Sequence, residues 1–166
     1  MPTTKDFLSD HHVISGVYPV ADFAATSVTT DYVSLENYRK VTFIIHTGDA
    51  TAGTADGTIT VLAATAAAGT GATAIAFRSR TCLSSATVDT WGALTARAAA
   101  GFSMTAGDNV LYAVEVDAAD VAAGLADADF VALKILEVTN DPIVGGILIV
   151  LSHPRYPQAV PVQAIA

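Results

Sequence analysis

The chain has 166 residues and a mass of 17.0 kDa, and 52% of its residues are hydrophobic, which suits one globular domain with its own core. Its net charge of -8, with only 8 lysines and arginines, argues against a nucleic-acid partner, because phosphate-backbone binding needs clustered cations. The single cysteine, Cys82, excludes an internal disulfide and a multi-cysteine zinc site. We therefore expect a domain that folds by packing alone, without a cofactor.

The N-terminal residues "MPTTKDFLSDHHVISG" show no basic region followed by an apolar stretch, so no secretory signal is visible. The apolar run Ile143–Leu151 has about half the roughly 20 residues that a membrane-spanning helix needs, and it contains adjacent glycines. We therefore expect assembly in a cytoplasm and no membrane partner.

Short segments rich in Val, Ile, Thr, Phe and Tyr recur along the chain between clusters of Gly, Asp and Asn, and this pattern indicates an all-β fold. We expect a single-domain antiparallel β-sandwich, jelly-roll-like, over residues 1–153. The predicted strands are Val13–Val20, Asp31–Leu35, Val41–Thr47, Thr58–Ala64, Ala74–Arg80, Ala100–Thr105, Val110–Val116, Phe130–Val138 and Ile143–Leu151.

Two glycine- and aspartate-rich connections, 46–58 and 139–146, have the composition of hairpin loops between adjacent strands. The segment 117–129, "DAADVAAGLADAD", predicts one short helical turn, with Asp117 as its N-cap and Gly124 at its end.

The predicted strands differ in how many of their faces are apolar. Val110–Val116 alternates between large apolar residues and Ala or Glu, as expected for a strand with one buried face. Phe130–Val138, apart from Lys134 and Glu137, and Ile143–Leu151 are apolar on both faces, so we expect them to lie centrally in a sheet or under a partner.

Residues that commonly carry chemistry are present without the spacing that chemistry requires. His11 and His12 are adjacent, so on a strand they point to opposite faces, and Cys82 has no signature of an activated thiol. No nucleophile-elbow pattern occurs, and we expect no enzymatic activity and no metal site. The densest acidic cluster does not match the EF-hand spacing and comprises Asp117, Asp120, Asp127 and Asp129.

Trp91, in "TVDTWGALTA", stands among small and polar residues, which leaves two interpretations open, a hydrophobic plug or an interface anchor.

The tail "SHPRYPQAVPVQAIA" contains prolines that favour an extended conformation and interrupt sheet pairing, so we expect an extended arm over 154–166. It is either a disordered end or an arm laid across a neighbouring molecule, and its Arg and Tyr favour the arm. The candidate partner-interface residues are Trp91, His153, Pro154, Arg155, Tyr156 and Pro157.

Five segments, "YVSLENYRKVTFIIHTG", "TAIAFRSR", "TVDTWGALTA", "AGFSMTAGDNVLYAVEVDAADV" and "FVALKILEVTNDPIVGGILIVLSHPRYP", resemble in this order a family of small virion structural proteins of tailed bacteriophages. The resemblance covers roughly Tyr32 to Ala166 and brings no catalytic residues with it. It implies a decoration or cement protein on the exterior of the phage head. The implied partners are the major capsid protein and further copies of this chain, with a trimer as the preferred assembly and dimers and monomers left open.

A carbohydrate-binding or host-attachment module is the alternative, because such modules are also all-β domains without a cofactor. They usually display several exposed aromatic residues on one sheet face. Only 7% of this chain is aromatic, and most of these residues fall within strand patterns, which favours the virion structural interpretation.

Overall fold

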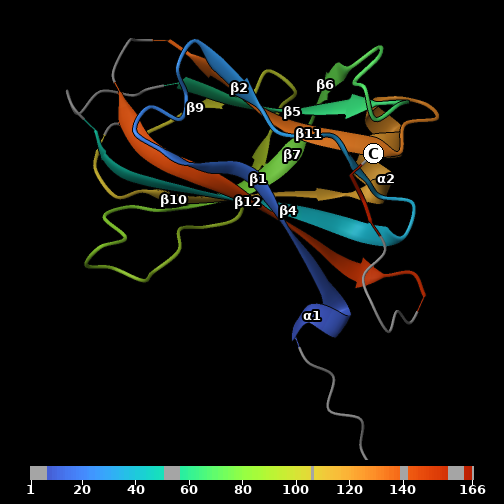
Figure 1. Cartoon of the computed structure of the whole chain (residues 1–166), viewed down its shortest axis with the longest axis horizontal. Coiled ribbons are helices and arrows are strands. Elements are labelled where there is room, and N and C mark those ends of the chain that lie inside the picture. The colour runs from blue at the N-terminus through green and yellow to red at the C-terminus, as the bar shows by residue number, and fades with distance from the viewer. Residues whose placement is uncertain (1–6, 51–56, 106, 139–141, 157–162, 166) are drawn as a thin grey trace, which may run out of the picture.

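The computed structural model describes residues 7–50, 57–105, 107–138, 142–156 and 163–165. They form two packed antiparallel sheets, so the predicted all-β sandwich is confirmed. In Figure 1 the strands β2, β5, β6 and β11 lie in the upper part of the view, above β4, β10 and β12 of the other sheet.

The two sheets are named here A and B. Sheet A has the strand order β1 (His11–Val20), β12 (Ile143–Pro154), β4 (Tyr38–Ala50), β10 (Leu111–Asp117), β7 (Phe77–Cys82) and β8 (Thr95–Arg97). Sheet B has the order β2 (Ser27–Thr29), β11 (Phe130–Glu137), β5 (Gly57–Ala64) and β6 (Thr73–Ile75), with β3 (Val33–Ser34) beside β11 and β9 (Phe102–Ser103) beside β5.

The strand order is that of a jelly roll. Strands β7 and β8 extend sheet A, and β3 and β9 are short additions to sheet B. Without these four, sheet A runs first, last, third and sixth strand, and sheet B runs second, seventh, fourth and fifth. This interleaving is produced by two Greek keys, and it places the last strand, β12, in the middle of sheet A, where β1 and β4 cover both its edges.

The two predicted hairpins are wrong because of this topology. Segment 46–58 links β4 in sheet A to β5 in sheet B, and segment 139–146 links β11 in sheet B to β12 in sheet A. Both segments therefore cross between the sheets, although residues 51–56 and 139–141 lie outside the described residues. Composition indicated a turn correctly but could not reveal which sheet the chain enters next.

The predicted strand Ala74–Arg80 is two strands, because the chain passes from β6 in sheet B to β7 in sheet A at Ala76. Asp31–Leu35 and Ala100–Thr105 shorten to the two-residue strands β3 and β9. The three-residue strands β2 and β8 have too few residues to show an alternating pattern, and the sequence did not predict them.

The predicted helical turn is present as α2 (Ala118–Gly124), and a second short helix, α1 (Phe7–Asp10), precedes β1. Asp117 stands at the N-cap of α2, but its side chain makes no capping hydrogen bond. Its carboxylate instead accepts from Arg78 on the neighbouring strand β7, and this contact raises the pKa of Arg78. The aspartate thus joins β7 to the start of the helix.

The core consists of the inward-facing residues of both sheets, which are buried at alternate positions. Tyr112 on β10 is among the largest of them, and its hydroxyl accepts a hydrogen bond from the Thr105 backbone N–H at 2.9 Å. Burial raises the pKa of Tyr112, because the charged phenolate would lose its hydration.

Candidate functional site

The outer face of sheet A, which points away from sheet B, carries large apolar side chains in its middle. Antiparallel partners that lie directly opposite share a face. Leu148 on β12 lies opposite Ser15 on β1 and Ile44 on β4, and Val150 lies opposite Val13. Leu148 is 50% exposed and Val13 is 38% exposed. Every second residue of β12 therefore faces outward, and the apolar side chains there are only partly covered by the described residues.

A groove of about 410 Å³ runs along this face over β12. One wall is formed by residues of β1 and the other by residues of β4, while the floor is the first half of β12. Most of its lining is apolar. The groove residues are Ser15, Val17, Pro19, Ile44, His46, Gly48, Asn109, Val144, Gly145, Gly146, Ile147 and Leu148.

The glycine pair in β12 gives the groove its depth. A Cβ on Gly146 would lie 3.0 Å from the carbonyl oxygen of Val17, so β1 can approach closely only because this residue has no side chain. A Cβ on Gly145 would lie 2.7 Å from a ring carbon of Phe23, which fills the inner side. The pair thus lets β1 and Phe23 pack directly against the β12 backbone.

Beside the groove stands a ridge, which we define as residues 83–94, the loop between β7 and β8. Cys82 lies opposite Leu111, which lies opposite His46 of the groove, so the thiol belongs to the outer face of sheet A. It is nevertheless 1% exposed, because the loop folds over it and the carbonyl oxygen of Val88 accepts from its Sγ at 3.4 Å. The ridge projects at the left of Figure 1.

The ridge has a defined backbone conformation. The backbone N–H and the hydroxyl of Ser85 both donate to the Asn109 carbonyl at 2.6 Å, and Asn109 also lines the groove. At the far end, Gly92 donates to the Thr81 carbonyl, and Arg80 donates to the Gly92 carbonyl, both at 2.9 Å. The exposed large apolar side chains of the ridge are Leu83, Val88, Trp91 and Leu94.

Trp91 belongs to this ridge and is 38% exposed. More than a third of its surface is therefore available to a partner, while the rest is covered by the protein. The covered part is consistent with a plug, and the role of an interface anchor stays a prediction.

The other predicted interface residues follow the opposite end of β12, and we call residues 153–156 the β12 exit. The strand continues to Pro154, opposite Tyr38, three residues beyond its predicted end, because a proline at a strand terminus removes only one donor. The Arg155 backbone N–H then donates to the Asn37 carbonyl at 2.9 Å. Tyr156 is 68% exposed, and Pro157 lies outside the described residues.

The structure does not bring Trp91 together with the β12 exit. The groove begins at the start of β12, whereas the exit comprises the last two residues of the strand and the two that follow. From Leu148 to Arg155 the chain advances seven residues, about 20 Å at the rise of a strand. The five predicted residues that the structure describes therefore belong to two surfaces at opposite ends of sheet A.

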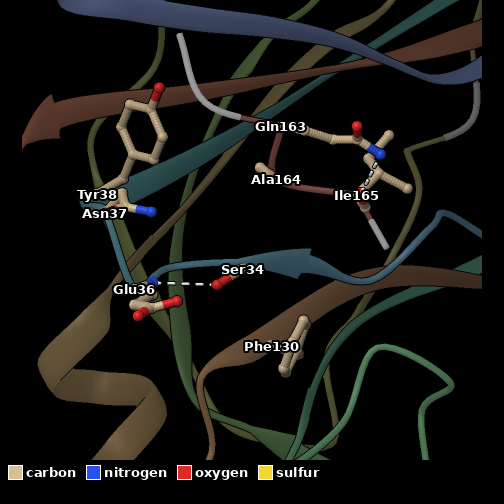
Figure 2. Close-up of a pocket in the computed structure, with 8 residues that line it drawn as sticks. All are labelled: Ser34, Glu36, Asn37, Tyr38, Phe130, Gln163, Ala164 and Ile165. Atoms are coloured by element: carbon tan, nitrogen blue, oxygen red, sulfur yellow. Dashed lines mark hydrogen bonds between the residues drawn. The ribbon is translucent and has the colours of Figure 1, made fainter. Parts of the chain in front are cut away.

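The described end of the tail packs on its own domain. Ser34 on β3 donates its backbone N–H to the Ala164 carbonyl at 2.9 Å, Ile165 bridges to Val33, and Ala164 is 6% exposed. Figure 2 shows Gln163, Ala164 and Ile165 on one side of a cavity of about 220 Å³, across from Ser34 and Phe130. The expectation of an arm that leaves the domain needs correction for residues 163–165.

Among the residues that the structure describes, no group of three or more His, Cys, Asp or Glu side chains is arranged to hold a metal ion. His11 Nδ1 is 3.0 Å from the Phe7 carbonyl oxygen, and two residues of the acidic cluster, Asp117 and Asp120, contact Arg78. Within the same part of the chain, none of the helices has the length and hydropathy needed to span a membrane.

No protein-family model matches the chain, and no curated protein matches it. Among solved structures, the crystal structure of the SPBc2 prophage-derived protein YomS aligns with 87% of this chain and with 94% of that chain. The TM-score is 0.43 and the sequence identity is 12%. This likeness carries no argument about function, so our interpretation rests on the residues and surfaces described above.

The sequence indicated only part of these surfaces. It marked Trp91, the β12 exit and the double-sided apolar character of Ile143–Leu151. It did not indicate the groove wall on β1 or the position of the ridge beside the groove. A signal for the groove was nevertheless present, because Gly145 and Gly146 interrupt an otherwise bulky apolar strand.

Proposed function

We propose that this protein is a virion structural protein, a decoration protein that binds the outside of a tailed-phage head and stabilises it. One observation supports the proposal. Sheet A exposes two separate surfaces at its opposite ends, the apolar groove with its ridge and the β12 exit, and we assign a partner to each. The ordered resemblance of five segments to small virion structural proteins supports the same function.

Reinforcing a shell requires contact with more than one neighbour at a time. Each contact on its own can be weak, because the second contact is made at a high effective concentration once the first has formed. A rigid sandwich with contact surfaces about 20 Å apart along one strand suits this task. A protein that contacts no neighbouring subunits would not need to expose either surface.

The β12 exit supplies the contact that we assign to the major capsid protein. Arg155 and Tyr156 are exposed, and these residue types are enriched at protein interfaces. The backbone hydrogen bond from Arg155 to Asn37 fixes where the exit begins, which lowers the entropy lost on binding.

Binding to heads that lack the protein tests this assignment. The double variant Arg155→Ala/Tyr156→Ala should bind about thirtyfold more weakly in co-sedimentation, since truncating an interface anchor typically costs about 2 kcal/mol. Tyr18→Ala is the matched control, because Tyr18 is 75% exposed but lies on β1. Equal binding by all three proteins, or binding of the wild type to host cells instead of heads, would contradict the proposal.

A further inference from the structure

The groove and the ridge lie on the same face of sheet A. Across β12, β4, β10 and β7, the residues Gly146, His46, Leu111 and Cys82 form one transverse row. Three strand spacings separate the ends of this row, about 14 Å. The groove therefore lies over one end of the row, and the ridge rises over the other end.

From this arrangement we propose that two copies of the chain associate face to face, with the ridge of each copy inserted in the groove of the other. A two-fold axis in the plane of the face, between ridge and groove and parallel to the strands, exchanges the two features. Both insertions then form at once, which is the self-complementary relation of an isologous dimer. The proposal does not depend on the proposed capsid function.

The charge distribution favours a second copy as the occupant. The chain carries a net charge of -8, so most pairs of its surfaces repel one another. The groove residues include no Asp, Glu, Lys or Arg, and the ridge contains a single carboxylate, Asp89. The groove and the ridge therefore add little repulsion of their own, although Asp49, which accepts from Asn109 at 2.6 Å, lies beside the groove.

The size of the face also fits a stable dimer. The groove is lined by twelve residues and the ridge contributes twelve more, from 83 to 94. A stable interface typically uses about 20 to 30 residues on each side, with an apolar centre that contains an aromatic anchor. Trp91 is the one tryptophan of the chain and lies on the ridge.

Sedimentation velocity from about 1 to 100 µM tests the association. The wild type should sediment as a dimer, with twice the 17.0 kDa mass of one chain. Trp91→Ala should weaken each ridge–groove contact about thirtyfold. Because the dimer contains two such contacts, its dissociation constant should rise about a thousandfold in total. Leu148→Asp, in the groove, should also give monomers.

Leu136→Asp is the matched control. Leu136 is 49% exposed on a central strand of sheet B, and Leu148 is 50% exposed on a central strand of sheet A. The control should remain dimeric, and both aspartate variants should keep the circular dichroism spectrum of the wild type. A monomeric wild type at 100 µM, or equal dissociation of both aspartate variants, would overturn the proposal.

Disulfide trapping identifies which features touch. Trp91→Cys and Leu148→Cys proteins, one of them carrying a mass tag, are mixed and oxidised. Ridge-in-groove packing should give mostly the mixed disulfide, whereas groove-on-groove packing would give Leu148→Cys homodimers and contradict the proposal. The wild type reports any reaction of Cys82, which is buried beneath the ridge.

Discussion

The outer faces of the two sheets differ in what they offer to solvent, although both belong to the same sandwich. On sheet B, the outward residues Lys134 and Leu136 of β11 lie opposite Thr60 and Thr58 of β5. Their partners on β2 are Thr29 and Ser27. On sheet A, the corresponding central strand carries Leu148 and Val150 beside Ile44 and Val13.

Both sheets therefore use the same alternation to fill the core, and they differ only in the residues that the alternation sends outward. Near β2 the outward set is mostly polar and suited to water. Further along the same face, β11 and β5 present Phe130, Ala132 and Leu62. An apolar outward set with a groove and an ordered ridge is suited to contact with a partner protein. The buried side of a strand thus indicates the fold, while its other side indicates the interactions of the protein.

The largest expected effect is the difference in unfolding free energy between substitutions on the inner face of each sheet and substitutions on its outer face. Ile149 and Ile135 are fully buried. Ile149 directly follows the half-exposed Leu148, and Ile135 directly precedes the half-exposed Leu136. Ile149→Ala and Ile135→Ala should each lower the free energy of unfolding by about 2 to 5 kcal/mol, because each leaves a core cavity.

Leu148→Ala and Leu136→Ala provide the comparison in the same urea titrations, carried out at concentrations where the protein is monomeric. Each should change the free energy of unfolding by less than about 1 kcal/mol. If Leu148→Ala costs as much as Ile149→Ala in the monomer, the outer face of sheet A belongs to the core of the single chain.

The next effect concerns the edge of sheet B, where the C-terminal residues cover β3. Ala164→Asp should lower the free energy of unfolding by about 1 to 3 kcal/mol, because it places a carboxylate in a buried position. Ala72→Asp, at an exposed turn, should be nearly neutral. Equal melting temperatures for the two variants would show that residues 163–165 do not anchor the tail on the domain.

The smallest effect tests the one hydroxyl that β10 directs into the core. Tyr112→Phe removes the acceptor for the Thr105 N–H and should cost about 1 kcal/mol. The pKa of Tyr112 is raised in the folded state, so the unfolded chain loses this proton first as the pH rises. Stability should therefore be retained below about pH 10 and fall above it.

Urea titrations between pH 8 and 11 measure this dependence. The decline should be shallower in Tyr112→Phe than in the wild type, although burial also raises the pKa of Tyr32 and Tyr38, which keeps part of the slope. An identical alkaline slope in both proteins would show that Tyr112 ionises equally in the folded and unfolded chains.

The sequence by itself determined the fold class, the positions of the long strands and the helical turn at residues 118–124. These features depend on local properties, namely alternation along five to ten residues, turn-forming residues and capping positions. It also marked Ile143–Leu151 as apolar on both faces, which is why this strand could be expected at the centre of a sheet or beneath a partner.

Tertiary structure alone decided which strands pair and what the outward residues of one strand meet. In this jelly roll most consecutive strands enter different sheets, although β5 and β6 stay together in sheet B. Segments that read as hairpins, 46–58 and 139–146, therefore join strands of different sheets. The groove combines residues from β1, β4 and β12, and the ridge reaches it through β10 and β7. Such contacts form between residues far apart in the chain, and no local pattern encodes them, because their free energy depends on the packing of the whole sandwich.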